Sequence, residues 1–541
     1  MDQTREAMAQ NLAERWCWQV ARRDATRVAR RLYRQQVVDG VSRLDEGAWL
    51  DDFVHVLQAT DVRAKLEQVH GTAIQRAMSP CVQDVLRYGL KTLFGIDRRH
   101  ALPGLRFSDE AVMPLVGLNA QQVRQGICQR GATSRQGARP PGPICPDTLA
   151  KQIVKLNWRD VEAVCNGRLR ALAKAGIFGA KVTGMADGTD LETTEHYRDC
   201  GQVTRQVRIE AKRGRVHAIE VTVYGWNGLL LIDAATKIPL AVKVGTIEAH
   251  ESHWLRALII QARMHLAGAT RLHTVVLDRG FWDGTALGWL DQHALLGVVP
   301  AKANMAGTVD ARAQAAAGEG ITVGRRVHTG RQGQGQTAWP ARLETAGVGM
   351  TGLTPDDQSG PAEHGRQANR RDFQPHVINA VVVRPWQGRA YGPGGKPVFR
   401  TNAAVQPPLQ PFDDDDARSR LETCGIKEAK QPWALGHPPQ KHERAVRVHA
   451  LLTRLLFALA TAYRLWGAQE AVGGAPVGWQ RWRRQLVEQT RDQVIVCAQG
   501  WYGSFHRAAC ALLMGVKLKD MPPGIGTAQE VLATYRLAAH G

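Results

Sequence analysis

The stretch Ala186-Asp187-Gly188-Thr189-Asp190 follows a short strand-like run, and the rest of the chain is organised around its first carboxylate. A second carboxylate, Asp278, ends the apolar, β-branched run 273–277, which is typical of a buried strand. A third, Glu422, lies in a charged stretch that predicts a helix. Mg²⁺ prefers oxygen ligands, and two such ions about 4 Å apart activate an attacking oxygen and stabilise a leaving one. The three carboxylates therefore predict a site for two Mg²⁺ ions, with Mn²⁺ as a substitute, if the fold brings them together.

Composition points to a polyanionic partner. The 541 residues carry a net charge of +20 and give a pI near 9.9, which favours nucleic acid over a merely basic soluble protein. The nine cysteines show no ligand spacing, so a structural zinc and a disulfide framework are not expected. The most apolar long segment, 446–463, is interrupted by charged residues and predicts a core helix rather than a membrane span. We expect a soluble protein of the cytoplasm, without a membrane partner.

Residues 19–38 predict an amphipathic helix with an arginine stripe opposite its apolar face. The stripe consists of Arg23, Arg27, Arg30 and Arg34. Such a stripe is suited to DNA phosphates, and an ordinary solvated helix face is the equally weighted alternative.

Two short helices around the turn 117–119 suggest a helix-turn-helix. The second helix, 120–129, carries Gln122 and Arg124, residue types that read adenine and guanine edges. Helix pairs that form for packing alone look the same in sequence, so the alternative stays open.

The middle of the chain predicts an α/β layer fold with a mixed sheet. The strand before Asp187 is expected to be followed by strands at 216–223, 229–233 and 238–244. The helix 254–266, the strand ending at Asp278, the helix 282–293 and the strand 296–300 then follow. From 303 onward, glycine is dense and helical periodicity is lost, which predicts a β-rich insertion.

Five regions are expected. They are a helical DNA-binding region (1–140), the first part of the core with its leading helices (147–302), the β-rich insertion (303–410), the second part of the core (411–470) and a helical C-terminal region (471–541).

The three carboxylate segments resemble those of DDE transposases of bacterial insertion sequences. The resemblance rests on the DGT at 187–189, the DRGF at 278–281 and Arg418-x3-Glu422, within 180–465. It implies an RNase H-like core in which Asp187, Asp278 and Glu422 are catalytic and bind the metal ions. It also implies binding of double-stranded DNA, both element ends and target, by a homodimer in a synaptic complex at the bacterial nucleoid.

The chain departs from the Tyr-x2-Arg-x3-Glu-x6-Lys signature of that subgroup. Asp415 occupies the tyrosine position and Ala429 the lysine position, with Lys430 and Lys427 nearby. At 100° per residue Lys430 lies closer than Lys427 to the face of Glu422.

Arg279 and Arg418 are further candidates for phosphate contacts, or for charge partners of the carboxylates themselves. The acidic run 413–416 is interpreted as a helix cap, and Asp190 as a neighbour of the site.

The resulting hypothesis is a transposase that cleaves and joins DNA by two-metal phosphoryl transfer. Two alternatives remain. One is a domesticated or inactive copy that represses by binding DNA, and the other is a nuclease of the same fold that hydrolyses DNA without joining it.

Overall fold

A computed structural model gives the architecture of the chain in two compact units, residues 169–428 and residues 1–168 with 429–541. Each unit is considered by itself. The structure describes residues 22–44, 49–51, 53, 61–71, 81–96, 101, 111–118, 145–197, 199–211, 215–281, 286–301, 306–318, 322–329, 340–350, 378–387, 398–404, 410–411, 414–415, 418, 433–440, 442–470, 479–489 and 491–537.

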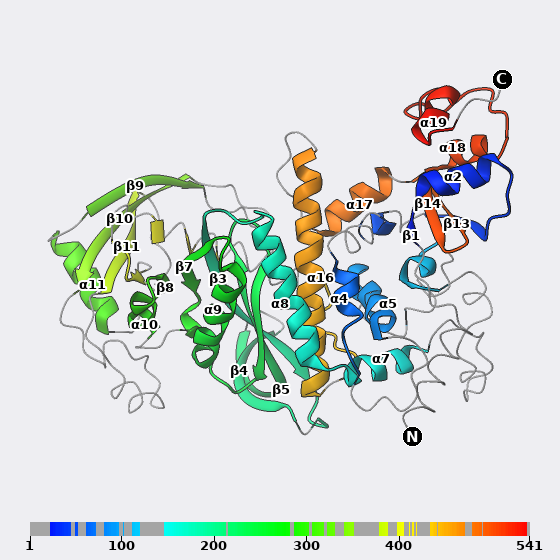
Figure 1. Cartoon of the computed structure of the whole chain (residues 1–541). Helices are drawn as coiled ribbons and strands as arrows, with labels where there is room; N and C mark the ends of the chain where they lie inside the picture. Colours follow the sequence, from blue (N-terminus) through cyan, green and yellow to red (C-terminus); the bar gives the residue numbers. More distant parts are fainter. Residues whose placement is uncertain are drawn as a thin grey trace. The chain divides into compact units, whose positions relative to one another are not determined.

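The unit formed by 169–428 is built on one ten-stranded sheet (Figure 1). Its centre comprises β3 (Lys181–Thr193), β5 (Arg215–Asp233), β6 (Pro239–Thr246), β7 (Arg271–Leu277) and β8 (Leu296–Pro300). β3 pairs antiparallel with β5 and parallel with β7, and β7 pairs parallel with β8. The mixed α/β class predicted from the sequence is confirmed.

Helices cover this sheet because its central strands are apolar on both faces. The run Leu229–Ile232 of β5 and the run Val275–Leu277 of β7 are almost completely buried. The helix α9 (Ser252–Leu266) packs on β5, β6 and β7, and α10 (Ala286–Gln292) packs on β8. Burial on both faces is what allows parallel strands at the centre of the sheet.

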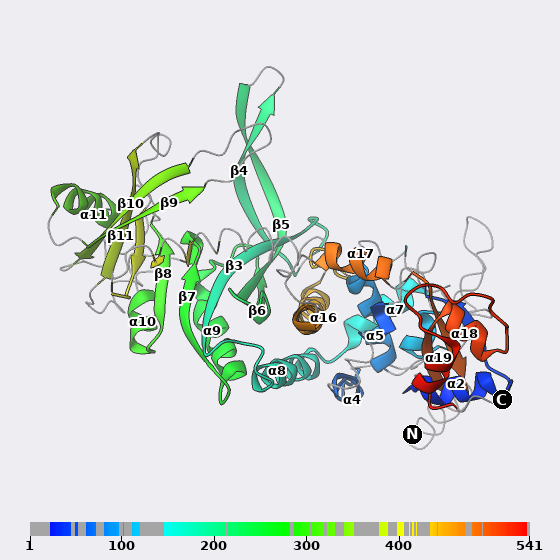
Figure 2. The ribbon, with the colours of Figure 1, turned by 90° about the horizontal axis from the view of Figure 1, so that it is seen from above.

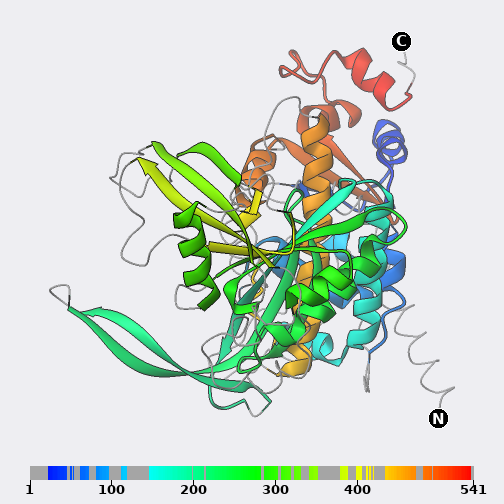
Figure 3. The same ribbon diagram turned by 90° about the vertical axis from the view of Figure 1, so that its left-hand side faces the viewer.

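A long two-stranded ribbon extends from one side of the sheet. The strand β4 (Gly201–Ala211) pairs with the first half of β5, and Figures 2 and 3 show the ribbon reaching beyond the other strands. The sequence did not predict β4, and it predicted two strands at 216–223 and 229–233 where the structure has the single 19-residue strand β5. Gly225 accommodates the continuation, with φ +156° and Leu191 O too close for a Cβ atom.

The β-rich insertion continues the same sheet. β12 (Val398–Thr401) pairs with β8, and β11 (Ile378–Gln387), β10 (Pro340–Met350) and β9 (Thr322–Thr329) follow in antiparallel order. The expected loss of helix after 303 was wrong in one place, because α11 (Ala306–Ala317) packs on β10 and β11. Alanines at 311 and 315 let this helix approach the strands closely, and their small, uniform side chains hid its periodicity.

The other unit contains a helical core. The helices are α5 (Cys81–Leu93), α7 (Pro146–Lys155), the beginning of α8 (Trp158–Lys174) and α16 (Glu443–Glu470). α16 confirms the core helix predicted over 446–463. Within the described residues α16 is the one helix long and apolar enough to cross a membrane, but 89% of its apolar window is buried. That burial is compatible with the core helix of a soluble protein.

Both ends of the chain form a small sheet in this unit. The hairpin of β13 (Gln493–Ala498) and β14 (Trp501–His506) is flanked by β1 (Arg22–Arg23) and β2 (Gly40–Arg43). The helices α2 (Ala25–Tyr33) and α18 (Arg507–Leu513) pack together beside the hairpin (Figure 1). Purely helical terminal regions were predicted, and the structure corrects this.

The correction has a physical cause in β13. Val494, Ile495 and Val496 are buried on both faces, and Val496 packs with Val28 of α2. A strand with both faces covered shows no alternation of apolar and polar residues, so the sequence alone gave no strand period.

Candidate active site

The first two predicted carboxylates lie side by side at the centre of the large sheet. Ala186 of β3 is paired with Leu277, the last residue of β7, and Asp187 and Asp278 are the next residues along the chain. Neighbouring strands are about 4.8 Å apart, so the two side chains start from adjacent positions. The sequence predicted a strand that ends near Asp187, whereas β3 continues to Thr193 and pairs there with β5. Only the parallel pairing with β7 stops here, with Ala186 as its last paired residue.

Arg418 connects these carboxylates. Its guanidinium lies 3.4 Å from Asp278 Oδ1 and 4.0 Å from Asp187 Oδ2, and its Nε donates to Asp415 Oδ1 at 3.1 Å. Burial by itself lowers the pKa of Arg418, but Asp415, Asp278 and Asp187 outweigh it and raise that pKa. The side chain is only 8% exposed and stays charged, so a buried cation already sits between the two predicted metal ligands.

Glu251 is a further carboxylate of the site that the sequence analysis missed. It comes directly before α9, and Asn227 Nδ2 donates to its Oε1 at 3.4 Å. Gly188 and Gly280 flank the carboxylate, because a Cβ atom built on either would come within 3.0 Å of its oxygens. Burial raises the pKa of Glu251, and the charges of Asp278 and Asp190 raise it further.

The glycines were the available signal for Glu251. Gly188 follows Asp187, and Gly280 comes two residues after Asp278, so each predicted metal ligand has a residue without a side chain beside it. That pattern indicates that something approaches the backbone at this point. It does not indicate that the approaching group is Glu251.

Asp190 and Arg205 form an ion pair on the outer side of the site. Arg205 of β4 donates to both carboxylate oxygens of Asp190, and this contact raises the pKa of the guanidinium. Asp190 is therefore held by the ribbon strand β4, in agreement with its interpretation as a neighbour of the site.

Other predicted residues divide into two groups. Arg279 is exposed next to Asp278 and forms no ion pair with another described residue. The residues Glu422, Lys427, Lys430, Gln122 and Arg124 lie outside the described part of the chain. The third member of the predicted triad therefore stays a prediction.

The arginine stripe lies in the other unit. Arg27 and Arg30 are exposed on α2, and Arg34 is exposed directly after its last turn. The guanidinium of Arg27 lies 4.5 Å from the ring centroid of Trp501. Arg23 precedes the helix, in β1, and forms an ion pair with Asp51 at 3.4 Å. The helix itself begins at Ala25 rather than at 19, because Asp24 caps it by accepting from Arg27 N. Three of the four arginines thus remain available on one helix or directly after it.

The donor set can be tested against a magnesium site. Across the described ranges, no three His, Cys, Asp or Glu side chains are grouped closely enough to hold a metal ion. Asp187 and Asp278 nevertheless face one shared cation, the Arg418 guanidinium, and both offer the hard oxygen donors that Mg²⁺ prefers. These two residues fit one side of such a site, and Glu422 is the further ligand that the sequence predicts.

The chain matches no family model, and no curated protein matches it at a significant level. The geometry of the site therefore carries the functional assignment.

Proposed function

We propose that the chain is a DNA transposase of the DDE type, which cleaves and joins DNA by metal-dependent phosphoryl transfer. The observation that carries the proposal is the matched position of Asp187 and Asp278 on neighbouring parallel strands, where both face one cation. Two carboxylates placed together in this way repel each other unless a cation lies between them. The repulsion between the two carboxylates lowers the stability of the fold, and their shared negative charge is suited to binding a cation at a reaction centre.

The strand order supports an RNase H-like core. The strands β6, β5 and β3 are antiparallel neighbours, and β7 and β8 follow in parallel with β3. The first carboxylate lies on β3 and the second directly follows β7, the parallel neighbour of β3, in keeping with the RNase H-like core that the resemblance to DDE transposases implies. The net charge of +20 supports a nucleic-acid partner.

Asp187 and Asp278, with Glu422, would hold the Mg²⁺ ions. When bound, these ions supply Lewis acidity and charge stabilisation at the scissile phosphate. Arg418 supplies a buried guanidinium that can pass from the carboxylates to a phosphate oxygen, and Arg279 is an exposed guanidinium beside Asp278. In the first reaction the oxygen of water bonds to phosphorus while the 3′ oxygen leaves. In the second, that 3′-hydroxyl attacks a phosphodiester of the target and displaces its 3′ oxygen.

The direct test is Asp278→Ala in the full chain. We expect cleavage of DNA that carries the element ends to be abolished, because a ligand is lost, while end binding stays close to that of the wild type. Loss of binding with cleavage spared would contradict the assignment. A strand-transfer assay with pre-cut ends separates the transposase from a nuclease of the same fold, which would hydrolyse ends without joining them.

One observation favours a second candidate, a protein that binds DNA without cutting it. Arg418 contacts Asp187, Asp278 and Asp415 together, so it competes with metal for the same carboxylates. Adding Mg²⁺ or Mn²⁺ to the protein with end-containing DNA distinguishes the two, because only the enzyme produces nicks. For the transposase, we further propose that it acts at the bacterial nucleoid, as a homodimer in a synaptic complex.

A further inference from the structure

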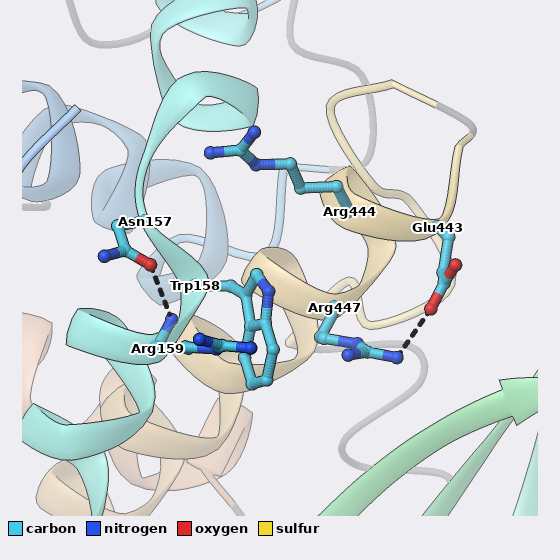
Figure 4. Close-up of a pocket in the computed structure, with 6 residues that line it drawn as sticks. All are labelled: Asn157, Trp158, Arg159, Glu443, Arg444 and Arg447. Atoms are coloured by element: carbon cyan, nitrogen blue, oxygen red, sulfur yellow. Dashed lines mark hydrogen bonds and ion pairs between the residues drawn. The ribbon is translucent and has the colours of Figure 1, made fainter. Parts of the chain in front are cut away.

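The unit formed by 1–168 and 429–541 contains a basic pocket of about 380 Å³ (Figure 4). It is lined by residues at the first turns of α8 and α16: Asn157, Trp158, Arg159, Glu443, Arg444 and Arg447. Three arginines and one glutamate give the lining a net charge of +2. The positive ends of both helix dipoles add to the attraction for an anion.

The guanidinium groups are positioned before any ligand binds. Those of Arg159 and Arg447 lie 5.5 Å and 4.8 Å from the ring centroid of Trp158. Arg444 donates to the carbonyl oxygens of Lys155 and Leu156, at the end of α7, at 3.3 Å and 3.0 Å. Groups held in this way lose little conformational freedom when they bind a phosphate.

Arg159 and Arg447 differ in their partners. Arg159 is exposed and forms no ion pair with the rest of the described chain. Arg447 Nη2 donates to Glu443 Oε1 at 2.5 Å, and the Glu443 side chain is 52% exposed. An exposed pair of this kind contributes little stability, so a phosphate can replace Glu443 as the partner of Arg447.

We propose that this pocket, called here the Trp158 pocket, binds a phosphate of the DNA backbone. The inference rests on the proposed function and adds a DNA contact on residues separate from the carboxylate site. The volume is in the range of pockets that take a small molecule, so a nucleotide unit fits better than a bare ion. Among the described residues that line the pocket, Asn157 alone has a carboxamide, and its Oδ1 accepts from Arg159 N. A guanidinium contact to a backbone phosphate carries no base-sequence information by itself.

Removing positive charge from the pocket should weaken DNA binding, and removing its negative charge should strengthen DNA binding. The double variant R159Q/R447Q removes two guanidiniums, and E443Q releases Arg447 from its carboxylate. The matched control is R170Q, which removes an exposed arginine of the same helix outside the pocket. Thermal unfolding of each variant reports whether it is folded.

Binding is measured by fluorescence anisotropy on the full chain, with a labelled 30-base-pair DNA duplex, EDTA and a salt series. We expect R159Q/R447Q to bind about 10-fold more weakly at 100 mM salt, with a shallower salt dependence, because each lost phosphate contact lowers the slope by about 0.9. E443Q should bind about 2- to 5-fold more tightly, and R170Q should match the wild type.

Unchanged affinity for DNA in both R159Q/R447Q and E443Q would overturn the inference. It would also be overturned if R159Q/R447Q lost more affinity for an RNA duplex of the same sequence than for the DNA duplex, because the pocket would then bind RNA. Neither result affects the proposed function, provided that the wild type still cleaves end-containing DNA with Mg²⁺. A wild type that neither binds nor cleaves DNA would instead end both proposals. If R159Q/R447Q fails to fold, E443Q provides the test: DNA binding no tighter than that of the wild type would overturn the inference.

Discussion

The two units of the chain differ in how their buried charged side chains are paired. In the unit formed by 1–168 and 429–541, three buried cations of the described chain each have their own local partners, and Arg87 also forms an ion pair with Asp84 at 3.3 Å. Arg87 donates to Gln83 at 2.7 Å, Lys91 to the carbonyl oxygen of His437 at 2.8 Å, and Arg454 to Asn166 at 3.5 Å. In the unit formed by 169–428, by contrast, carboxylates gather around one guanidinium.

This difference separates structural charge from charge available for chemistry. A buried ionic group with one good partner fixes a local conformation and leaves nothing to react with a ligand. A cluster with surplus charge of one sign costs stability and is retained where a counter-ion or substrate completes it. Asp187, Asp278, Asp415 and Glu251 together exceed what Arg418 neutralises.

The largest expected effect is on DNA cleavage, and it tests whether the excess negative charge around Arg418 is needed for catalysis. Asp187→Asn and Asp278→Asn should each lower DNA cleavage on the order of a thousandfold, and the double variant should be no worse, because both residues act on one centre. Cleavage rates at saturating DNA measure this. Arg205→Gln, which changes charge at the rim of the site, is the control. Multiplicative losses in the double variant would mean that the two carboxylates act independently.

The next effect concerns a buried neutral group in the helical unit. His449 Nε2 donates to Ala434 O at 2.9 Å, and Tyr88 OH donates to its Nδ1 at 2.8 Å. Burial lowers the pKa of His449 to about 3, and Lys91 contributes to the lowering. The unfolded histidine has the higher pKa, so the stability contribution is complete above about pH 6.5 and is lost as the pH falls towards the folded value.

Unfolding in denaturant at pH 6.5 and at pH 4.5 should therefore show a loss of about 2–3 kcal/mol that is due to His449. His449→Gln, which cannot be protonated, should remove that part of the pH dependence although it is less stable at neutral pH. An identical pH dependence in the variant would show that other groups cause the loss.

Gly188→Ala tests the close approach of Glu251 to the strand. A Cβ atom at 188 would come within 3.0 Å of the Glu251 carboxylate, so the carboxylate or the strand must shift. We expect a loss of about 1–3 kcal/mol in the free energy of unfolding, together with weaker cleavage. Gly167→Ala on α8 is the control, because nothing lies within 4 Å of a Cβ atom there and the helix should gain up to about 1 kcal/mol.

The smallest expected effect is that of the exposed ion pair between β3 and β4. Arg205 is 42% exposed, and exposed pairs are screened by water and salt. Arg205→Gln should change the free energy of unfolding by less than about 1 kcal/mol, and less still in high salt. A larger loss would mean that this pair is needed to hold β4 on the sheet.

Parts of the central sheet could be predicted from sequence because they are apolar, β-branched runs bounded by turns. The run ending at Asp278 and the helix 254–266 were identified in this way and lie where the sequence placed them, whereas the strand predicted before Asp187 continues to Thr193. Glu251 was missed because its importance comes from the neighbouring glycines of two other segments.

The sequence by itself determined the residue types of the site, the basic character of the chain and most helices of the core, since these depend on composition and on local periodicity. Only the tertiary structure decided that Asp187 and Asp278 share one level of the sheet, that the strands after 320 extend that same sheet, and that both chain ends build a second one. Strand pairing joins residues far apart in the chain through backbone hydrogen bonds. These bonds are the same for every residue type except proline, so side-chain order does not specify the partner.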